Sequence, residues 1–307
     1  MKVVSKTAIF VALLMGAAAP SAGQSAKCDA ECLERIAREY RAAYRAHDTK
    51  LAPFASSVRY TENNVEMPFP DGTWDTVTAE PGPPLVLSDP TTGNISIFTS
   101  VMQDEIPGFL AVRLHVNAEG KIDEVEHILS TRRSLSSPPT PIGNIQEYRH
   151  DPVINETPSA ADRASREQLA AHANGYFDTL QLNDGEIRGT CFHDSATRNE
   201  NGLLFKDIKR GFERGGYRFN NRVRREIIMV DEKRQVAVGR GFIDHKGVLN
   251  EYMLTDGTEA RSIFQEPQSW GLLEAFKVKD GCIAAVVATF YQAPYYQRSP
   301  WTKGPDR

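Results

Sequence analysis

The feature that most constrains this chain is an internal repeat. The stretch Tyr60-Thr61-Glu62-Asn63-Asn64 has a counterpart in Arg198-Asn199-Glu200-Asn201-Gly202, and each follows a segment with apolar residues at helical spacing. Each half also closes with two apolar stretches joined by a carboxylate-glycine pair, Glu119-Gly120 and Asp280-Gly281. Such pairs favour tight turns between antiparallel strands. The sequence therefore predicts two copies of one scaffold in tandem.

Within each copy the apolar spacing predicts a helix followed by strands. In the first half it predicts a helix over 32–47 with Asp29 as its N-cap, and strands over 58–65, 94–103, 109–116 and 121–129. In the second half it predicts a helix over 165–182, and strands over 222–231, 234–244, 272–279 and 282–291. A helix that precedes antiparallel strands is typical of the α+β class. We expect each sheet to curve around its helices and form a cone with an open apolar pocket.

The boundaries of these units follow from composition. Residues 131–160 hold five prolines and several serines, which predicts a linker between the domains. The first cone is then expected over 27–130, the second over 161–300 and a short C-terminal tail over 301–307.

The N-terminal residues 1–26 have the pattern of a secretory signal peptide. Two lysines precede an apolar run that is too short to span a bilayer, and small residues follow it. Without this segment the chain has 34 Lys+Arg against 40 Asp+Glu, a formal charge of −6, and no basic patch that would indicate nucleic-acid binding. We therefore expect an exported protein, periplasmic or secreted, with no nucleic-acid partner and no membrane attachment once the signal is removed.

The four cysteines, Cys28, Cys32, Cys191 and Cys282, fit disulfides, because their number is even and an exported protein meets an oxidising compartment. One arrangement joins Cys28 to Cys32 and leaves Cys191 to pair with Cys282. Three pairings are possible, and the sequence leaves the choice open. The chain has no zinc-finger spacing, no glycine-rich nucleotide loop and no nucleophile elbow, so we expect no metal and no cofactor.

Glu62 is the candidate catalytic residue of the first half, because it shares a strand face with Val58 and Tyr60. Burial in an apolar cone would raise the pKa of this carboxyl group toward the range useful for general acid-base catalysis. His127 lies on an apolar strand face, and it or Tyr60 would supply or stabilise the proton. The alternatives are a structural glutamate that accepts backbone N–H groups and a core histidine bonded to a carbonyl.

Three further residues of the first half are candidates for substrate binding. Asn63 and Asn64 stand beside the glutamate and could hydrogen-bond either its carboxylate or a substrate oxygen. Trp74 offers a surface for an aromatic ring, although a packed core aromatic is the alternative.

Glu200 repeats this arrangement in the second half and is a further catalytic candidate. Arg198 and Asn201 beside it are candidates for substrate binding, but Arg198 would also hold the carboxylate ionised, which argues against a general base. Gly202 indicates a turn and therefore favours a structural role. Because Ala288 stands where the first half has its histidine, the comparison favours the first cone as the catalytic one.

Glu274 is an acidic residue on an apolar strand face, which it shares with Leu272 and Phe276. A carboxylate in such a place needs a partner. We expect Arg240, on a nearby strand, to form a structural ion pair with Glu274.

The order of elements resembles the SnoaL-like, nuclear-transport-factor-2-like cone fold. Five stretches carry a closer resemblance to an exported tandem-cone family of fungi and bacteria, over nearly all of residues 28–300: Ala46-His47-Asp48, Tyr60 to Asn64, Glu200-Asn201-Gly202, Glu274 to Val278 and Ala293-Pro294-Tyr295. The resemblance implies two tandem cones. The wider superfamily includes cofactor-free isomerases, dehydratases, epoxide hydrolases and aryl-propane formaldehyde lyases, as well as non-catalytic binding modules, so it implies several chemistries at once.

These observations lead to a functional hypothesis. It is a cofactor-independent lyase or isomerase that acts on a small aromatic substrate, with Glu62 as the general base. By analogy with the superfamily, one candidate reaction is loss of formaldehyde from lignin-derived aryl-propane dimers. The alternatives are an epoxide hydrolase or dehydratase that uses the same carboxylate, and a module that only binds an apolar ligand. Whether the chain forms a homo-oligomer is left open.

Overall fold

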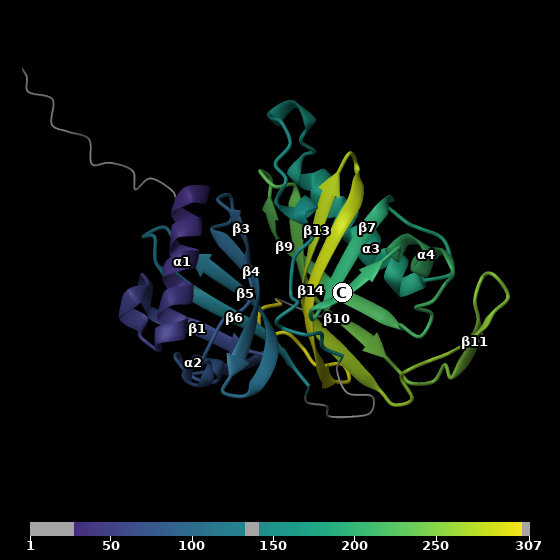
Figure 1. Cartoon of the computed structure of the whole chain (residues 1–307), viewed down its shortest axis with the longest axis horizontal. Coiled ribbons are helices and arrows are strands. Elements are labelled where there is room, and N and C mark those ends of the chain that lie inside the picture. The colour runs from purple at the N-terminus through teal and green to yellow at the C-terminus, as the bar shows by residue number, and fades with distance from the viewer. Residues whose placement is uncertain (1–27, 133–140, 303–307) are drawn as a thin grey trace, which may run out of the picture.

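The computed structural model describes residues 28–132 and 141–302, which form two domains that share one plan (Figure 1). The expected signal peptide and the end of the expected tail, residues 303–307, lie outside the described residues. The first domain consists of α1 (Ala30–Ala46), β1 (Phe54–Glu62), β2 (Val65–Met67), α2 (Thr73–Thr76), β3 (Leu85–Asp89), β4 (Asn94–Gln103), β5 (Ile106–Val116) and β6 (Ile122–Thr131). The second consists of α3 (Arg166–Leu182), β7 (Phe192–Glu200), β8 (Leu203–Lys206), α4 (Ile208–Glu213), β9 (Arg222–Asp231), β10 (Val236–His245), β11 (Glu251–Met253), β12 (Glu259–Arg261), β13 (Gln268–Lys279) and β14 (Cys282–Pro294).

The strand order of the two sheets is the same. The first sheet runs β2-β1-β6-β5-β4-β3 and the second β8-β7-β14-β13-β10-β9, with the β11–β12 hairpin as an insertion between β10 and β13. The predicted fold class, α+β with two tandem cones, is thereby confirmed. The sheets are mixed, however, where wholly antiparallel sheets were predicted. β1 pairs in parallel with β6, and β7 with β14, because the first strand of each unit joins the last, and the long intervening chain allows either direction.

Local sequence accounts for the two long helices. The Asp29 side chain accepts the Cys32 N–H at the start of α1, as predicted for an N-cap, and Ser165 and Gln168 form a capping box at the start of α3. Each helix lays an apolar face on the inner side of its own sheet. The buried residues are Leu33, Ile36, Ala37, Tyr40, Ala43 and Tyr44 in α1, and Leu169, Ala173, Gly175, Tyr176, Phe177, Thr179 and Leu180 in α3.

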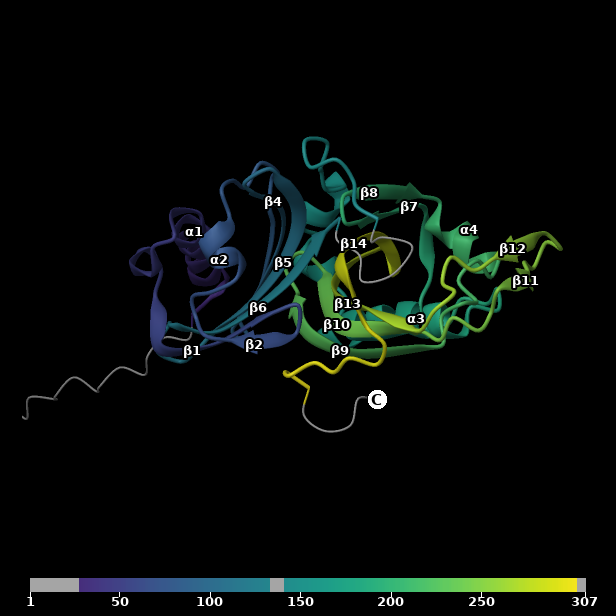
Figure 2. The same cartoon turned by 90° about the horizontal axis from the view of Figure 1, so that it is seen from below.

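The two domains pack back to back through the outer faces of their sheets, with the helices on the far sides (Figures 1 and 2). One apolar cluster spans this interface, and its members come from both sheets: Leu85, Leu87, Phe98, Ala111 and Ile128 of the first, and Ile228, Met229, Val236, Val238, Phe242, Leu273, Ala275, Val287, Tyr291 and Ala293 of the second. Both faces of each sheet are therefore buried, which explains why several strands read as nearly continuous apolar runs.

The chain segments that join the domains are also packed. Ile142, Ile145 and Tyr148 of the expected linker form a buried cluster with Phe109 of β5. Beyond β14 the chain returns to the first domain, where the Trp301 ring lies under arginine side chains. The relative position of the two domains is therefore fixed by these two segments as well as by the contact between the sheets.

Both disulfides form in the arrangement described in the sequence analysis. Cys28 is bonded to Cys32 and Cys191 to Cys282. The second bond ties the residue before β7 to the start of β14. Two disulfides fit an oxidising compartment. Within the described ranges, no helix has the length and apolar character needed to cross a membrane.

Candidate functional site

The two repeated glutamates end strands β1 and β7, and each is followed by a tight turn. The turn residues have positive φ angles, 50° at Asn63 and 61° at Asn64, and 46° at Asn201 and 79° at Gly202. Asparagine and glycine tolerate this conformation, which two-residue hairpins require. The sequence therefore places Glu62 and its counterpart at the same point of each cone.

The asparagine after each glutamate has a structural task. The Asn63 side chain accepts the Leu129 N–H at 2.8 Å and donates to the Leu129 carbonyl at 3.1 Å. Asn201 makes the same two bonds with Phe290, at 2.9 and 3.0 Å. Asn64 donates to the Tyr291 hydroxyl at 3.1 Å. The side-chain amides of Asn63, Asn64 and Asn201, which the sequence predicted to bind substrate, are therefore hydrogen-bonded within the protein.

In the first cone the structure brings Glu62, Tyr60 and His127 together, as predicted. Glu62 Oε2 accepts from the Thr73 N–H at 3.0 Å, the Thr73 hydroxyl at 2.5 Å and the Tyr60 hydroxyl at 3.2 Å. His127 Nδ1 lies 3.7 Å from the same oxygen, and its Nε2 lies 2.6 Å from the Tyr40 hydroxyl. A continuous polar network therefore runs from Glu62 into the core of the domain.

This network changes the acidity of Glu62 in the direction opposite to the prediction. Burial raises the pKa of Glu62, but a hydrogen bond and charge from His127, together with the two Thr73 bonds, lower the pKa by more. The net pKa lies below the usual value. The raised pKa expected for this carboxyl group is thus wrong, because the prediction considered burial and not the donors that accompany it.

Aromatic rings fill the interior of the first cone. Trp74 is 1% exposed and packs edge-on against Tyr40, Tyr44, Phe54 and Phe69, with ring centroids 5.0–5.7 Å apart. Trp74 is therefore a core residue, the alternative considered for it above. Packed aromatic side chains therefore occupy the region around Trp74, where an open pocket was expected.

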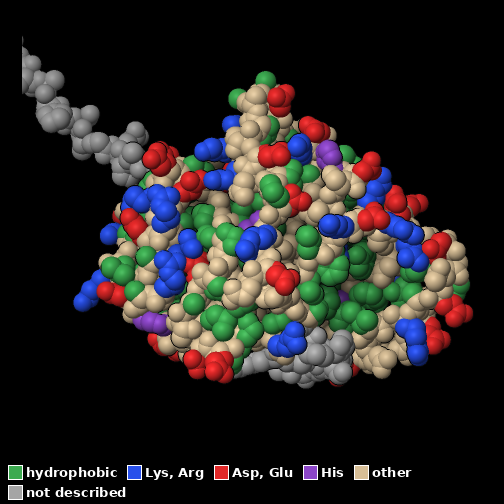
Figure 3. Space-filling model, viewed as in Figure 1, with side chains coloured by type: hydrophobic (Ala, Val, Ile, Leu, Met, Phe, Trp, Pro, Cys, Tyr) green, Lys and Arg blue, Asp and Glu red, His purple; other side chains and the backbone are tan. Residues whose placement is uncertain are grey.

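The second cone does contain an open cavity, of about 250 Å³. Its wall is mostly apolar and aromatic, and its lining includes Leu180, Phe205, Phe219, Ile243, Ile263, Trp270, Leu272, Ala288 and Phe290. Figure 3 shows a hollow surrounded by hydrophobic side chains on the half of the molecule that holds this domain. Trp270 stacks on Phe290 with ring centroids 4.6 Å apart, which gives the wall a flat aromatic surface.

A small set of polar groups converges on this cavity. Arg198 Nε lies 2.8 Å from Glu200 Oε1, and the other guanidinium nitrogens donate to the hydroxyls of Tyr176 and Tyr217 at 3.2 and 2.9 Å. All four residues line the cavity together with Glu274. Glu200 and Arg198 are thus brought together as predicted, whereas the sequence singled out neither tyrosine as a site residue. Tyr217 falls in a segment without periodic signal.

The predicted ion pair between Glu274 and Arg240 is wrong. In the β10–β13 ladder Glu274 lies opposite Gly239, whereas Arg240 lies opposite Leu273. Side chains of adjacent strand residues point to opposite faces, so Glu274 faces the cavity and Arg240 faces the first domain. There Arg240 Nε lies 3.4 Å from Glu126 Oε1.

Glu274 has a strongly raised pKa in the cavity. Burial raises its pKa and the nearby Glu200 carboxylate raises it further, while Arg198 and a hydrogen bond from Tyr176 lower it, and the result is a pKa of about 8. Glu274 is only 3% exposed. At neutral pH Glu274 is therefore mainly a neutral carboxylic acid that can donate a proton.

Comparison with known proteins finds one family model that is similar to part of this chain. A family model described as a domain of unknown function, DUF8021, matches residues 162–290. Among solved structures, PrhC from Penicillium brasilianum is similar at 15% identity and a TM-score of 0.30, over 41% of this chain and 82% of that one. An NTF2-like protein of unknown function from Cytophaga hutchinsonii is similar at 12% identity and a TM-score of 0.25, over 41% and 99%. A third, from Burkholderia xenovorans and also NTF2-like, has 10% identity and a TM-score of 0.27, over 45% and 96%. No curated protein matches the chain. The matched family thus falls on the domain with the open cavity.

Proposed function

We propose that the second cone is the working site and that the protein is a cofactor-independent isomerase or lyase for a small apolar or aromatic molecule. The observation that carries this proposal is Glu274, a neutral carboxylic acid at the wall of an apolar cavity that also holds the Glu200–Arg198 pair. Two carboxyl groups in different environments are the arrangement that acid-base catalysis needs. The first-cone residues Glu62 and His127 are then part of a structural network.

The chemistry follows from the two environments. Glu274 donates a hydrogen bond to a carbonyl or hydroxyl oxygen of the substrate and stabilises negative charge that develops there. Glu200 accepts a proton from the carbon next to that carbonyl. Return of the proton to a different carbon gives an isomerase. If Glu200 instead takes the proton of a β-hydroxyl group, the carbon-carbon bond breaks, an aldehyde leaves and the electron pair passes to the substrate's enolate.

The dimensions of the cavity limit the substrate. Pockets for drug-sized molecules enclose about 300–1,000 Å³, and this one encloses about 250 Å³. A substrate with one ring and one polar oxygen fits this volume better than the aryl-propane dimer considered above. The stacked Trp270 and Phe290 side chains offer the flat contact that such a ring needs.

A specific observation also favours a second candidate, a binding module without turnover. Arg198 already donates to Tyr176 and Tyr217 and pairs with Glu200, so much of the polar set is engaged internally. In that case the apolar wall alone would hold the ligand.

The experiment offers the purified protein single-ring β,γ-unsaturated ketones and β-hydroxy ketones and follows products by absorbance and chromatography. We expect turnover that falls about 100-fold or more in Glu274→Gln and Glu200→Gln, and that persists in Glu62→Gln and in the exposed control Glu226→Gln. Ligand binding without any product would favour the binding module. Loss of turnover in Glu62→Gln alone would move the active site to the first cone.

A further inference from the structure

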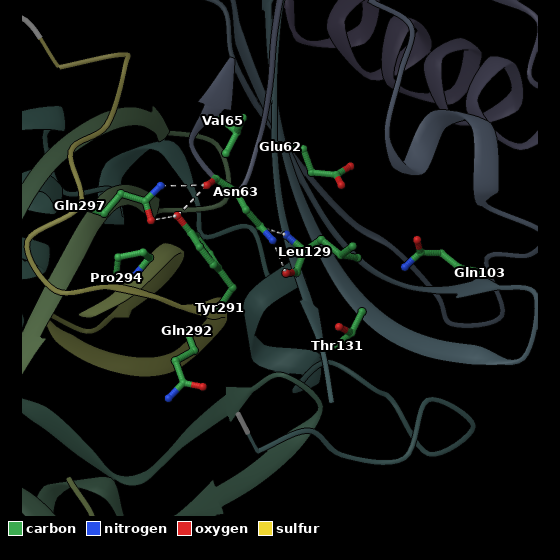
Figure 4. Close-up of a pocket in the computed structure, with 10 residues that line it drawn as sticks. All are labelled: Glu62, Asn63, Val65, Gln103, Leu129, Thr131, Tyr291, Gln292, Pro294 and Gln297. Carbon is green, nitrogen blue, oxygen red and sulfur yellow. Dashed lines mark hydrogen bonds between the residues drawn. The ribbon is translucent and has the colours of Figure 1, made fainter. Parts of the chain in front are cut away.

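A second cavity lies in the cleft between the two domains and is independent of the second-cone site. It encloses about 400 Å³, which is within the range of small-molecule sites. Figure 4 shows Glu62 and Gln103 on the side of the first domain, and Tyr291, Gln292 and Gln297 on the side of the second. A ligand in this cleft would therefore touch both domains.

The wall of the cleft is preformed. The Tyr291 hydroxyl donates to the Asn63 carbonyl at 2.7 Å, and Gln297 Nε2 donates to the same carbonyl at 3.2 Å. The Tyr291 hydroxyl also lies 3.1 Å from Gln297 Oε1 (Figure 4). The two bonds to Asn63 cross the domain boundary and hold the second-domain wall against the β1–β2 turn. A ligand would enter a shaped site with little ordering of side chains.

The charge in the cleft has one sign. Among the described residues of the lining, Glu62 alone is charged at neutral pH, since the others are amides, hydroxyls and apolar groups. The pKa of Glu62 lies below its usual value, which keeps the carboxylate ionised. Since neither arginine nor lysine belongs to this described lining, the cleft disfavours anions.

One oxygen of that carboxylate is available to a ligand. The three donors from Thr73 and Tyr60 all go to Oε2, His127 Nδ1 also lies nearest to Oε2 at 3.7 Å, and no described residue donates to Oε1. The side chain is 16% exposed. An anion held in place by three donors, with its second oxygen unpaired, matches an N–H donor that carries positive charge. Tyr291 adds an aromatic ring, whose face attracts cations.

We propose that the interdomain cleft binds a small organic molecule with a protonated amino group, which pairs with Glu62 Oε1. The apolar part of the molecule packs against Val65, Leu129 and Pro294, which also line the cleft. Glu62 therefore has a binding role in this cleft, separate from the catalytic carboxyls of the second cone.

The test is calorimetric titration of the full exported chain at pH 7 and low salt. The probes are 2-phenylethylamine and 1,4-diaminobutane, with 2-phenylethanol and 3-phenylpropanoate as the neutral and anionic counterparts. We expect at least one amine to bind about tenfold or more tightly than either counterpart. Glu62→Gln should weaken that binding about tenfold, while Glu105→Gln, an exposed residue outside the lining that changes the net charge equally, should not.

Two further variants keep the result decisive if Glu62→Gln disturbs the fold. Val65 is 54% exposed at the cleft, so Val65→Trp should block entry without touching the carboxylate. Glu274→Gln should leave amine binding intact. Equal affinity for amine and alcohol, unaltered binding in both cleft variants, or loss of binding in Glu274→Gln would each overturn the proposal. The last outcome would place the amine in the second cone.

Discussion

His127 and Ala288 occupy the same place in the two sheets. His127 lies opposite Glu62 in the parallel β1–β6 ladder, and Ala288 lies opposite Glu200 in the β7–β14 ladder. The imidazole is fully buried among aromatic rings, whereas the alanine lines the second-cone cavity. The size of one side chain at this position thus contributes to one closed and one open cone.

The first prediction tests this relationship with Ala288→His. The imidazole would enter the cavity beside Glu274, its neighbour across the β13–β14 ladder, and would take up volume that the ligand needs. We expect ligand binding or turnover in the second cone to fall at least tenfold, because overpacking a formed site costs about 1–3 kcal/mol. The measurements are the affinity for the ligand and the thermal midpoint of unfolding. Ala288→Ser, which adds a single oxygen, is the matched control and should retain most of the binding.

The second prediction concerns the pH dependence of stability. The folded-state pKa of Glu274, about 8, lies above its ordinary value of 4.5, so the unfolded chain releases this proton first as the pH rises. Stability therefore falls between about pH 4.5 and 8, with a slope of at most about 1.4 kcal/mol per pH unit, and levels off above pH 8. Glu274→Gln should remove this component. Denaturant unfolding of the wild-type protein and of Glu274→Gln from pH 5 to 9 measures this component. The same dependence of stability on pH in both proteins would contradict the raised pKa of Glu274.

The same group sets an upper limit to the catalytic pH range. Since Glu274 must be protonated to act as a donor, turnover should decline as the pH rises through about 8. A rate that continues to increase above pH 9 would show that Glu274 does not act as the acid.

The third prediction compares the two disulfides. The Cys191–Cys282 bond closes a separation of 91 residues and the Cys28–Cys32 bond a separation of 4. Because the longer loop restricts the unfolded chain more, replacing Cys191 and Cys282 by serine should cost about 2–4 kcal/mol and the shorter pair less. Denaturant unfolding of the two double variants measures both losses. A larger loss for the N-terminal pair would mean that helix capping, and not chain entropy, dominates.

The fourth prediction concerns the return of the chain to the first domain. The Trp301 ring lies 4.3 Å from the guanidinium of Arg59 and 4.5 Å from that of Arg113, and its indole N–H donates to the Thr61 hydroxyl at 2.9 Å. Trp301→Ala should lower stability by about 1–3 kcal/mol and increase amide exchange in β1. Tyr295→Ala, at a side chain that is 37% exposed, is the control with a small expected effect.

Local sequence was sufficient for much of the architecture. Apolar periodicity located both long helices and most strands, and the Glu-Asn turns located Glu62 and Glu200, because these signals depend on neighbours a few residues apart. The short strands β2, β3, β8, β11 and β12 were missed, since each spans only three to five residues and carries little periodic signal.

The environment of each site residue depended on contacts between residues that are far apart in the sequence. Strand parity decided that Glu274 faces the cavity while Arg240 crosses to Glu126 in the other domain. The groups that lower the pKa of Glu62 are His127 of β6 and Thr73 of α2, and together they outweigh the burial that would have raised it.

By itself, then, the sequence determined the duplication, the helix-then-strand order, the cysteines available for disulfides and the positions of both glutamates, since all of these follow from residue type and short-range spacing. Only the tertiary structure decided which cone is open, what surrounds each carboxyl group and how the sheets pack back to back. Those outcomes depend on the summed volume and charge of side chains that reach one point from distant parts of the chain, and spacing along a sequence does not encode that sum.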